Sequence, residues 1–488
     1  MNKLLPTIHI FSKLGLFFAL LMWLPTLVSY LFNDEAFYVF RNTAIVTVIL
    51  SSLVLLVTRR YQRELRPRDG FILVVMMWLG FALIAAMPIY FYLEELSFTD
   101  AFFEGMSALT TTGASVIPNL EKLPPSLNFW RHLLCWLGGM GIIVLAVAIL
   151  PMLGVGGTQL FKAEIPGVEK DTKIAPRISQ VAKRLWLMYF SFTFVIGVAF
   201  YFSGMNWFDA LCHAMSAFSL TGFSTKDKGI TYFDSVAVET IIILATIAGS
   251  MSFANHFTAL KQKNLKKSLQ IYWQNEEVRI MLIVLFFSMV ITIDYLIYKG
   301  YYSPLDALRY VTFNFINVAL TAGFSNADFA SWPLVITLWL FFLANILANA
   351  GSMGGGVKLV RAIALAKITL RETLMLQHPN AVHSVKVNDK NVNERLAMSI
   401  MAFIFMYFMT VVLFTFIMMI TGEDLITAFS AVLACVTNTG VGLGGVGPSH
   451  NFGTLNDLQK WLCIFAMLLG RLEMFTVFIL FTPAYWKK

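Results

Sequence analysis

A short stretch of small and hydroxyl residues that leads to a single glycine occurs four times in this chain. The copies are 109–115, 218–224, 319–325 and 436–442, and their glycines are Gly113, Gly222, Gly323 and Gly440. Each copy lies between two apolar segments. Because the same succession of segments returns four times, the fold has to accommodate four similar units within one chain.

The apolar segments are long enough to cross a lipid bilayer. Hydrophobic residues make up 58% of the 488 residues, charged residues make up 13%, and the mean hydropathy is +0.71. Runs of about 20 apolar residues, the length that spans the hydrocarbon core, recur from the first few dozen residues to the end. The first run, 11–32, is too long for a secretory signal and lacks a cleavage site. We therefore predict an all-α membrane protein with many spans.

The basic residues fall in alternate loops between these segments. Five arginines lie within 59–68, directly after the second apolar run, and lysines cluster again within 261–267. Loops of this kind face the cytoplasm, so we predict that both termini are cytoplasmic. The net charge of +8 therefore reflects membrane topology, and we expect no nucleic-acid partner.

Each unit combines a span, a short helix, a glycine stretch and a returning span. The short helices have about three turns, which is too few to cross a membrane. The predicted division of the chain is 1–69 for two amino-terminal spans with a basic loop, 70–184 for the first repeat, 185–279 for the second, 280–395 for the third with a cytoplasmic segment, and 396–488 for the fourth.

The start signals of the short helices are in register with the glycines. Asp100, Asp209 and Thr427 each stand 13 residues before the glycine of their own unit. Asp306 in the third unit lies four residues further back, which predicts one extra helical turn there.

A half-helix followed by extended chain is a costly element in lipid, because each unpaired carbonyl costs several kcal/mol there. Four such elements around one axis solve this problem together, since their carbonyls point at the axis and a dehydrated cation becomes the missing partner. Glycine suits backbone that is strained or crowded, and threonine and serine add hydroxyl ligands. One copy alone is also compatible with small-residue helix packing, whereas four copies in register favour an ion pore.

The predicted filter of this pore consists of each glycine and the three residues before it. These residues are Thr110, Thr111, Thr112, Gly113, Ser219, Leu220, Thr221, Gly222, Leu320, Thr321, Ala322, Gly323, Thr437, Asn438, Thr439 and Gly440.

At these residues the sequence resembles the superfamily of potassium transporters, and within it the membrane subunits of bacterial Trk systems (TrkH/TrkG type). The resemblance covers essentially the whole chain. It implies ten transmembrane helices and four re-entrant half-helices around a fourfold pseudosymmetric pore, with potassium as the transported substrate. Relatives that have serine at the first glycine position pass sodium more easily, so the four glycines here favour potassium.

The resemblance also implies a homodimer in the bacterial cytoplasmic (inner) membrane, above a ring of cytosolic, nucleotide-binding regulatory subunits of the TrkA kind. This chain has no nucleotide-binding glycine signature of its own, because the glycines of 351–356 lie within a span and no strand precedes them. We therefore expect any nucleotide to bind the partner, and no cofactor to bind this chain.

The returning spans share a second site, at 137–141, 248–252, 350–354 and 469–473, which we expect to ring the pore below the filter. The third copy continues into a glycine-rich segment that weakens any helix, so this span should break. The break is either a packing kink or, as the resemblance implies, a mobile gate. The candidate gate residues in this segment are Gly351, Ser352, Gly354, Gly355 and Gly356.

The fourth copy of this second site carries Arg471, and an arginine inside a span is costly unless it is paired or functional. Glu473 is two residues further on, on another helix face, and is a poor partner for it. Arg471 either pairs with another carboxylate or with carbonyls away from the pore, or faces the permeation path and regulates cations. We adopt the second interpretation as a hypothesis.

Other polar residues of the repeats have supporting roles in this interpretation. Glu104, His213, Asn314 and Asn317 lie on the short helices and should buttress the filter by hydrogen bonds. The polar loop predicted at 371–395 contains His378 and His383. The four cysteines, Cys135, Cys212, Cys435 and Cys463, lie in or beside apolar segments without metal-ligand spacing, so neither a disulfide nor a zinc site is expected.

The sequence therefore predicts potassium uptake through a gated filter. A less selective potassium and sodium channel, or a symporter coupled to protons or sodium, stays open as an alternative. A secondary transporter of an organic solute is a more distant alternative, because it would show twofold repeats around one midplane site. No HExxH, GxSxG or clustered carboxylates occur, so we do not expect an enzyme.

Overall fold

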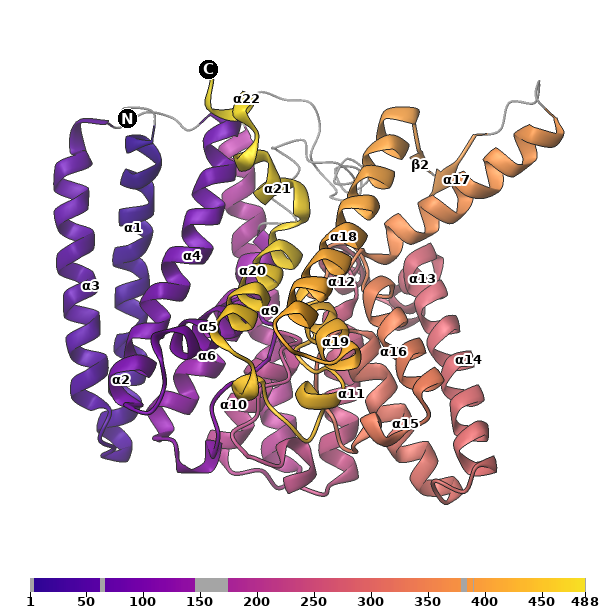
Figure 1. Cartoon of the computed structure of the whole chain (residues 1–488), viewed down its shortest axis with the longest axis horizontal. Coiled ribbons are helices and arrows are strands. Elements are labelled where there is room, and N and C mark those ends of the chain that lie inside the picture. The colour runs from indigo at the N-terminus through magenta and orange to yellow at the C-terminus, as the bar shows by residue number, and fades with distance from the viewer. Residues whose placement is uncertain (1–3, 62–65, 145–173, 379–383, 389, 488) are drawn as a thin grey trace.

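The computed structural model describes residues 4–61, 66–144, 174–378, 384–388 and 390–487. The chain begins with α1 (Leu5–Leu21) and α2 (Trp23–Phe32), which together form one candidate span, and continues with α3 (Phe37–Thr58) and η1 (Arg59–Tyr61). Pro25 has no N–H for the carbonyl of Leu21, which explains the interruption between α1 and α2. These helices stand at one edge of the molecule (Figure 1).

The remaining helices follow one order four times, with a long helix, a short helix, the glycine stretch and a returning helix. The first group is α4 (Pro67–Tyr92), α5 (Phe98–Leu109), η2 (Leu120–Lys122) and α6 (Pro125–Val144). The second group is α9 (Ile174–Phe202), α10 (Trp207–Phe218), η4 (Gly229–Tyr232), α11 (Val236–Ser250) and α12 (Phe253–Leu260).

The third group is α13 (Leu265–Gln274), α14 (Glu276–Tyr298), α15 (Pro304–Ala319), η5 (Phe329–Ser331), α16 (Leu334–Ile346) and α17 (Leu359–Gln377), followed by the hairpin of β1 (Lys386–Val387) and β2 (Lys390–Asn391). The two strands are antiparallel, and Lys386 is opposite Asn391. The fourth group is α18 (Glu394–Ile420), α19 (Leu425–Val436), η6 (Gly444–Val446), η7 (Phe452–Thr454), α20 (Asp457–Leu472), α21 (Met474–Phe478), η8 (Ile479–Phe481) and α22 (Pro483–Trp486).

The four half-helices α5, α10, α15 and α19 begin at side-chain caps, as their sequences predict. The cap residues are Ser97, Asn206, Ser303 and Asp424, and each accepts a hydrogen bond from a backbone N–H in the first turn. Helices α5, α10 and α19 have 12 residues each, whereas α15 has 16. The extra turn predicted for the third repeat is confirmed.

Six helices in the described ranges are long and apolar enough to cross a membrane, and eight spans result if each of two bent pairs counts as one. The bent pairs are α11 with α12, at 100°, and α20 with α21, at 111°. The returning segments of the second and fourth repeats are therefore bent and not straight. The returning helix of the first repeat, α6, is helical through Val144, and residues 145–173 lie outside the described residues.

The break after α11 has a physical cause that lies in another repeat. The carbonyl of Ser250 accepts a hydrogen bond from the N–H of Asn349, and that of Gly249 accepts one from Met353. The N–H of Phe253, at the start of α12, donates to the carbonyl of Gly351. The loop 347–358 thus supplies partners for backbone groups that a continuous helix would pair internally.

The break predicted in the third returning span is confirmed, because α16 ends at Ile346 and α17 begins only at Leu359. The polar loop predicted at 371–395 is wrong in its first part, since α17 continues to Gln377. Residues 371–377 include several good helix formers, which explains the continuation. His378 is exposed after this helix, and His383 lies outside the described residues.

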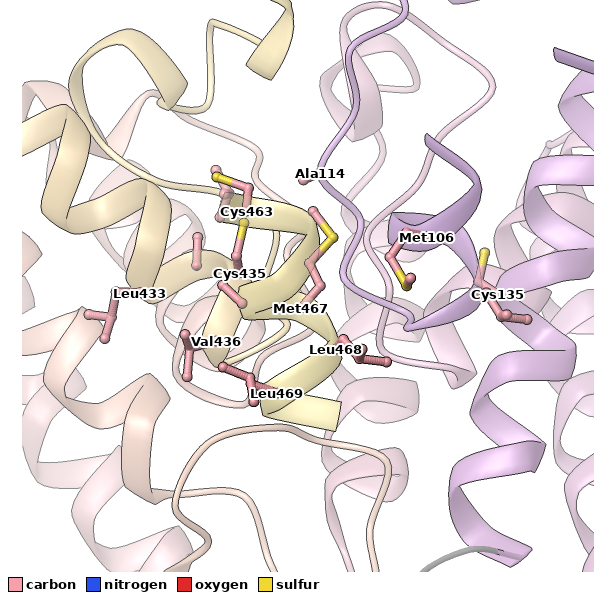
Figure 2. Close-up of a cluster of buried hydrophobic side chains, with 14 of the residues drawn as sticks. Met106, Ala114, Cys135, Leu433, Cys435, Val436, Cys463, Met467, Leu468 and Leu469 are labelled. Carbon is pink, nitrogen blue, oxygen red and sulfur yellow. The ribbon is translucent and has the colours of Figure 1, made fainter. Parts of the chain in front are cut away.

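The half-helices are enclosed by the returning helices. Helix α6 packs against α5 and α10, α11 packs against α10 and α15, and α20 packs against α19 and α5. Figure 2 shows this arrangement where the fourth group meets the first, with Val436, Met467 and Met106 among the buried side chains. All four cysteines are buried and free, so the expectation of unpaired buried thiols is confirmed.

Candidate permeation site at the four glycine stretches

The four glycine stretches share one backbone conformation. The first residue after each half-helix is close to right-handed, with φ between −76° and −98°. The second residue and the glycine are left-handed, with φ of 50° to 60° at Thr111, Leu220, Thr321 and Asn438 and φ of 75° to 84° at Gly113, Gly222, Gly323 and Gly440. A left-handed non-glycine residue is unfavourable, and its recurrence at one position indicates that the surroundings impose it.

The glycines bring the four stretches together in a closed ring. A methyl group on any of them would meet the carbonyl oxygen of the residue before the glycine of the next stretch. The distance from the added carbon to the carbonyl oxygen would be 1.6 Å between Gly113 and Thr221 and 2.6 Å between Gly222 and Ala322. It would be 2.3 Å between Gly323 and Thr439 and 2.1 Å between Gly440 and Thr112. The order of contacts returns to its starting stretch, so all four stretches surround one axis and only glycine fits at these positions.

Hydroxyl groups pair within three of the four stretches. Thr110 and Thr112 are joined by a hydrogen bond of 2.8 Å between their side-chain oxygens. Equivalent bonds join Ser219 to Thr221, at 2.7 Å, and Thr437 to Thr439, at 2.8 Å. The third stretch has Leu320 and Ala322 at these places, so the ring combines three hydroxyl pairs with one apolar pair.

A polar cavity of about 770 Å³ opens onto one side of the ring, and all four glycines line it. Its walls come from the segments that follow the glycines, including 224–231 and 446–452. Both chain termini lie on one side of the molecule, and the half-helices lie away from that side (Figure 1). We call the polar cavity that the four glycines line the entrance cavity.

The loop 347–358 packs against the ring near the carboxyl ends of the half-helices α15 and α19. A methyl group on Gly355 would lie 1.9 Å from the carbonyl oxygen of Thr437, and the N–H of Gly355 donates to the hydroxyl of Thr321. Ser352 donates to the carbonyl of Asn349 at 2.6 Å. Gly351 and Gly356 have φ of 71° and 77°, so the loop uses left-handed turns.

The second site of the returning spans contacts the second residue of each stretch, in the predicted register in the first, second and fourth repeats but not in the third. Methyl groups on Gly138, Gly249 and Gly470 would lie 3.2, 3.0 and 3.0 Å from the side chains of Thr111, Leu220 and Asn438. In the third repeat Gly354 takes this place, and a methyl group on it would lie 3.1 Å from the hydroxyl of Thr321. The alignment of Gly351 with the other three glycines is therefore wrong in space, because the chain is unwound before it reaches the ring.

Arg471 is buried and holds two carbonyl groups. Its Nε donates to the oxygen of Thr110 at 2.6 Å, and its Nη1 donates to the oxygen of Met353 at 2.9 Å. Carbonyl pairing was one of the two interpretations, although these carbonyls belong to the first stretch and to the loop below it. Glu473 pairs with Arg361 of α17 at 2.7 Å, in agreement with the prediction that Arg471 is not its partner.

A family model described as TrkH, cation transport protein, matches residues 37–488. The chain belongs to the TrkH family. As a TrkH-family member it is a multi-pass membrane protein and a transport protein, not an enzyme. The resemblance inferred from the glycine stretches is confirmed.

Relatives within the TrkH family align with nearly the full chain. The Trk system potassium uptake protein TrkH of Halomonas elongata is 42% identical over 482 residues and covers 99% of both chains. The TrkG protein of Escherichia coli is 34% identical over 480 residues and covers 98% of each. The crystal structure of the potassium transporter TrkH from Vibrio parahaemolyticus superimposes with a TM-score of 0.90 at 38% identity, over 99% of this chain and 100% of that one.

Polar side chains on the first three half-helices of this TrkH-family protein bind the chain that follows the glycine of their own repeat. Glu104 accepts from Ser115, His213 is 2.9 Å from the hydroxyl of Ser224, and Asn314 donates to Asn326 at 2.7 Å. Asn317 instead accepts from Thr246 of α11 at 2.9 Å. These contacts confirm the expected buttressing by hydrogen bonds.

Arg131 on α6 also belongs to this site and was not predicted from the sequence. It pairs with Glu104 at 2.8 Å, and both side chains are fully buried. The signal that singled out Arg471, an arginine within an apolar span, was also present in 127–136.

Thr321 offers a test of how the loop is held in this TrkH-family protein. Thr321→Val removes the acceptor of the Gly355 N–H while it preserves the side-chain shape, and a buried donor without a partner costs about 1–3 kcal/mol. We expect a lower melting temperature. Thr111→Val is the matched control, because Thr111 is the equivalent residue of the first stretch and its hydroxyl has no hydrogen-bond partner among the described residues. Equal losses for both variants would contradict this assignment.

Proposed function

We propose that this chain carries potassium into the cell as the membrane subunit of a Trk-type uptake system, and that the ion passes through the ring of four glycine stretches. The observation that carries the proposal is the closed order in which each glycine meets a carbonyl of the next stretch. The names of the relatives, Trk system potassium uptake protein, indicate the ion.

The filter works by replacing the hydration shell of the ion. Backbone oxygens around the axis, together with the hydroxyls of three stretches, substitute for water when potassium leaves the entrance cavity. The carboxyl ends of α5, α10, α15 and α19 meet at the stretches, and each contributes a partial negative charge there. Both features favour a monovalent cation over an anion.

The gate of the proposed pathway is the loop 347–358 together with Arg471. This loop lies against Thr321 and Thr437 at the ring, and Arg471 ties its Met353 carbonyl to the first stretch. A positive side chain at this place opposes cation passage. Opening then requires the loop to move and Arg471 to release at least one carbonyl.

The proposed topology contains ten transmembrane helices and four re-entrant half-helices, divided into an amino-terminal pair and four repeats. Eight spans, bent pairs included, support it by length and composition, and α6 and the interrupted pair of α16 and α17 supply the other two. We place the protein in the bacterial cytoplasmic membrane with both termini inside, as a homodimer. A cytosolic TrkA-like subunit binds the regulatory nucleotide, and this chain binds none.

One observation favours a less selective pathway for potassium and sodium. The third stretch contributes Leu320 and Ala322 where the other stretches contribute hydroxyl pairs. A site with fewer ligands discriminates less sharply between ions of different size. This second candidate differs from the first in its sodium flux.

Flux in proteoliposomes tests the proposal. Purified protein is compared for uptake of potassium, rubidium, sodium and lithium, with and without a pH gradient and in the presence of an inward sodium gradient. We expect potassium and rubidium to pass and lithium to be excluded. Equal flux of potassium and lithium would refute the filter, and an obligatory pH or sodium gradient would indicate symport.

A further inference from the structure

A buried ion pair lies behind the first glycine stretch. Glu104 is in the middle of α5, nine residues before Gly113, and Arg131 is on α6. Nε and Nη2 of Arg131 both lie 2.8 Å from Oε1 of Glu104, and both side chains have 0% exposure. A buried pair is unfavourable unless further hydrogen bonds satisfy it.

The carboxylate of the pair holds the chain that leaves the filter. It accepts a hydrogen bond from the hydroxyl of Ser115 and one from the backbone N–H of Val116, each at 3.1 Å. These residues follow Gly113 directly after Ala114. Glu104 therefore fixes the part of the first stretch that follows Gly113 to its own half-helix.

The guanidinium of the pair reaches the neighbouring stretch. Arg131 lies over the ring of Phe223, 4.3 Å from its centroid, and Phe223 follows Gly222 of the second stretch. Arg131 also donates to Asn128 and Ser115, at 3.3 Å each. It contributes to the wall of the entrance cavity together with Gly113 and Gly222. A positive charge thus stands beside the route by which a cation reaches the ring.

The other three half-helices carry no ion pair at the position of Glu104, and the charged contact of the second, between Asp209 and Lys226 at 3.3 Å, lies one turn earlier on α10. At the position of Glu104 the second, third and fourth half-helices have His213, Asn314 and Ala431. The first two bind Ser224 and Asn326, and in the fourth Ser430, next to Ala431, binds the backbone of Leu443. Among the residues that the structure describes, an ion pair at this position occurs only in the first repeat.

We propose that Glu104 and Arg131 form a positioning pair that determines how well this protein discriminates potassium from sodium. The pair fixes the ring between the first and second stretches, and Glu104 neutralises a guanidinium that would otherwise repel cations at the entrance. This inference rests on the proposed function of the ring as a potassium filter.

The charge argument gives opposite expectations for the two single variants. Glu104→Gln leaves Arg131 positive and unpaired, so the KM for potassium should rise about tenfold, the lower end of the range by which charge at a cleft changes local ion concentration. Arg131→Gln leaves a carboxylate near the entrance, so the KM should not rise. Both variants lose the ion pair that fixes the first stretch relative to the second, so both should admit more sodium relative to potassium. The double variant Glu104→Gln/Arg131→Gln should recover the KM but not the selectivity.

The experiment measures rubidium uptake with sodium as competitor, using the full chain in proteoliposomes. Lys367→Gln, which breaks the ion pair of Lys367 with Glu276 at 2.6 Å away from the ring, is the control and should leave both the KM and the selectivity unchanged. If Glu104→Gln is not recovered folded, Arg131→Lys replaces it, since lysine keeps the charge but cannot form the two-point contact. That variant should lose selectivity at unchanged KM.

Unchanged selectivity and KM in every folded variant of the pair would overturn the inference. The same holds if the KM moves in one direction for both single variants, because charge then plays no part. A wild-type protein that carries lithium as well as potassium would instead refute the proposed filter itself. The two failures are therefore distinguishable.

Discussion

Replacing Gly323 with alanine should reduce potassium uptake by about a hundredfold, a loss that corresponds to nearly 3 kcal/mol. The added methyl group would lie 2.3 Å from the carbonyl oxygen of Thr439 and 3.4 Å from that of Thr221. Both atoms belong to the backbone of neighbouring stretches, so the ring has to widen or tilt. Displaced carbonyls no longer replace the hydration shell of potassium. Rubidium uptake by purified protein measures this loss.

Gly300→Ala is the matched control for this variant. Gly300 has the same φ of 75° as Gly323, but a methyl group there would meet nothing within 4 Å. Both alanines carry the same cost of left-handed backbone, about 1 kcal/mol. Only the variant in the ring should lose transport. Equal activity of the two proteins would show that the crowding at Gly323 has no role in permeation.

Replacing Arg471 with methionine should raise potassium flux in the absence of any cytosolic partner by about tenfold or more. The change removes the hydrogen bonds that join the carbonyls of Thr110 and Met353, and a hydrogen bond to a charged group contributes about 1.5 kcal/mol or more. The loop 347–358 is then free to leave the ring. Flux into proteoliposomes that contain only this chain measures the effect.

Arg471→Lys separates the two ways in which this arginine acts. Lysine keeps the positive charge, but its single ammonium group cannot reproduce the fork that spans two carbonyls. Flux that stays low in the lysine variant and rises in the methionine variant assigns the block to charge. Flux that rises in both assigns it to the carbonyl tie. Wild-type flux in both variants would show that Arg471 has no role in the gate.

Local sequence signals were sufficient to predict the half-helices and the break in the third returning span. Caps, register and helix length depend on neighbouring residues, which is why the extra turn before Gly323 could be predicted from the position of Asp306. The convergence of the four glycines was also predictable, because irregular backbone in a membrane needs a common partner.

The break after α11 was not predictable in the same way. The carbonyls of Gly249 and Ser250 find their partners on the loop 347–358, about 100 residues further along the chain. A local sequence pattern contains no information about such a partner. The same loop displaced Gly351 from its expected place and put Gly354 against Thr321.

Arg131 shows a second reason why part of the site could not be predicted from the sequence. Its apolar surroundings gave the same signal as those of Arg471, but its partner Glu104 lies 27 residues earlier on another helix. The pair becomes visible only when α5 and α6 are placed side by side. Buried charges within apolar spans therefore merit equal attention before their partners are known.

Anomalous scattering from crystals soaked in rubidium tests the central claim most directly, because it locates the ion without reference to flux. The account predicts a peak on the axis between Gly113, Gly222, Gly323 and Gly440, within coordination distance of the backbone oxygens of the stretches. Peaks confined to other cavities, with none inside the ring of glycines, would contradict it.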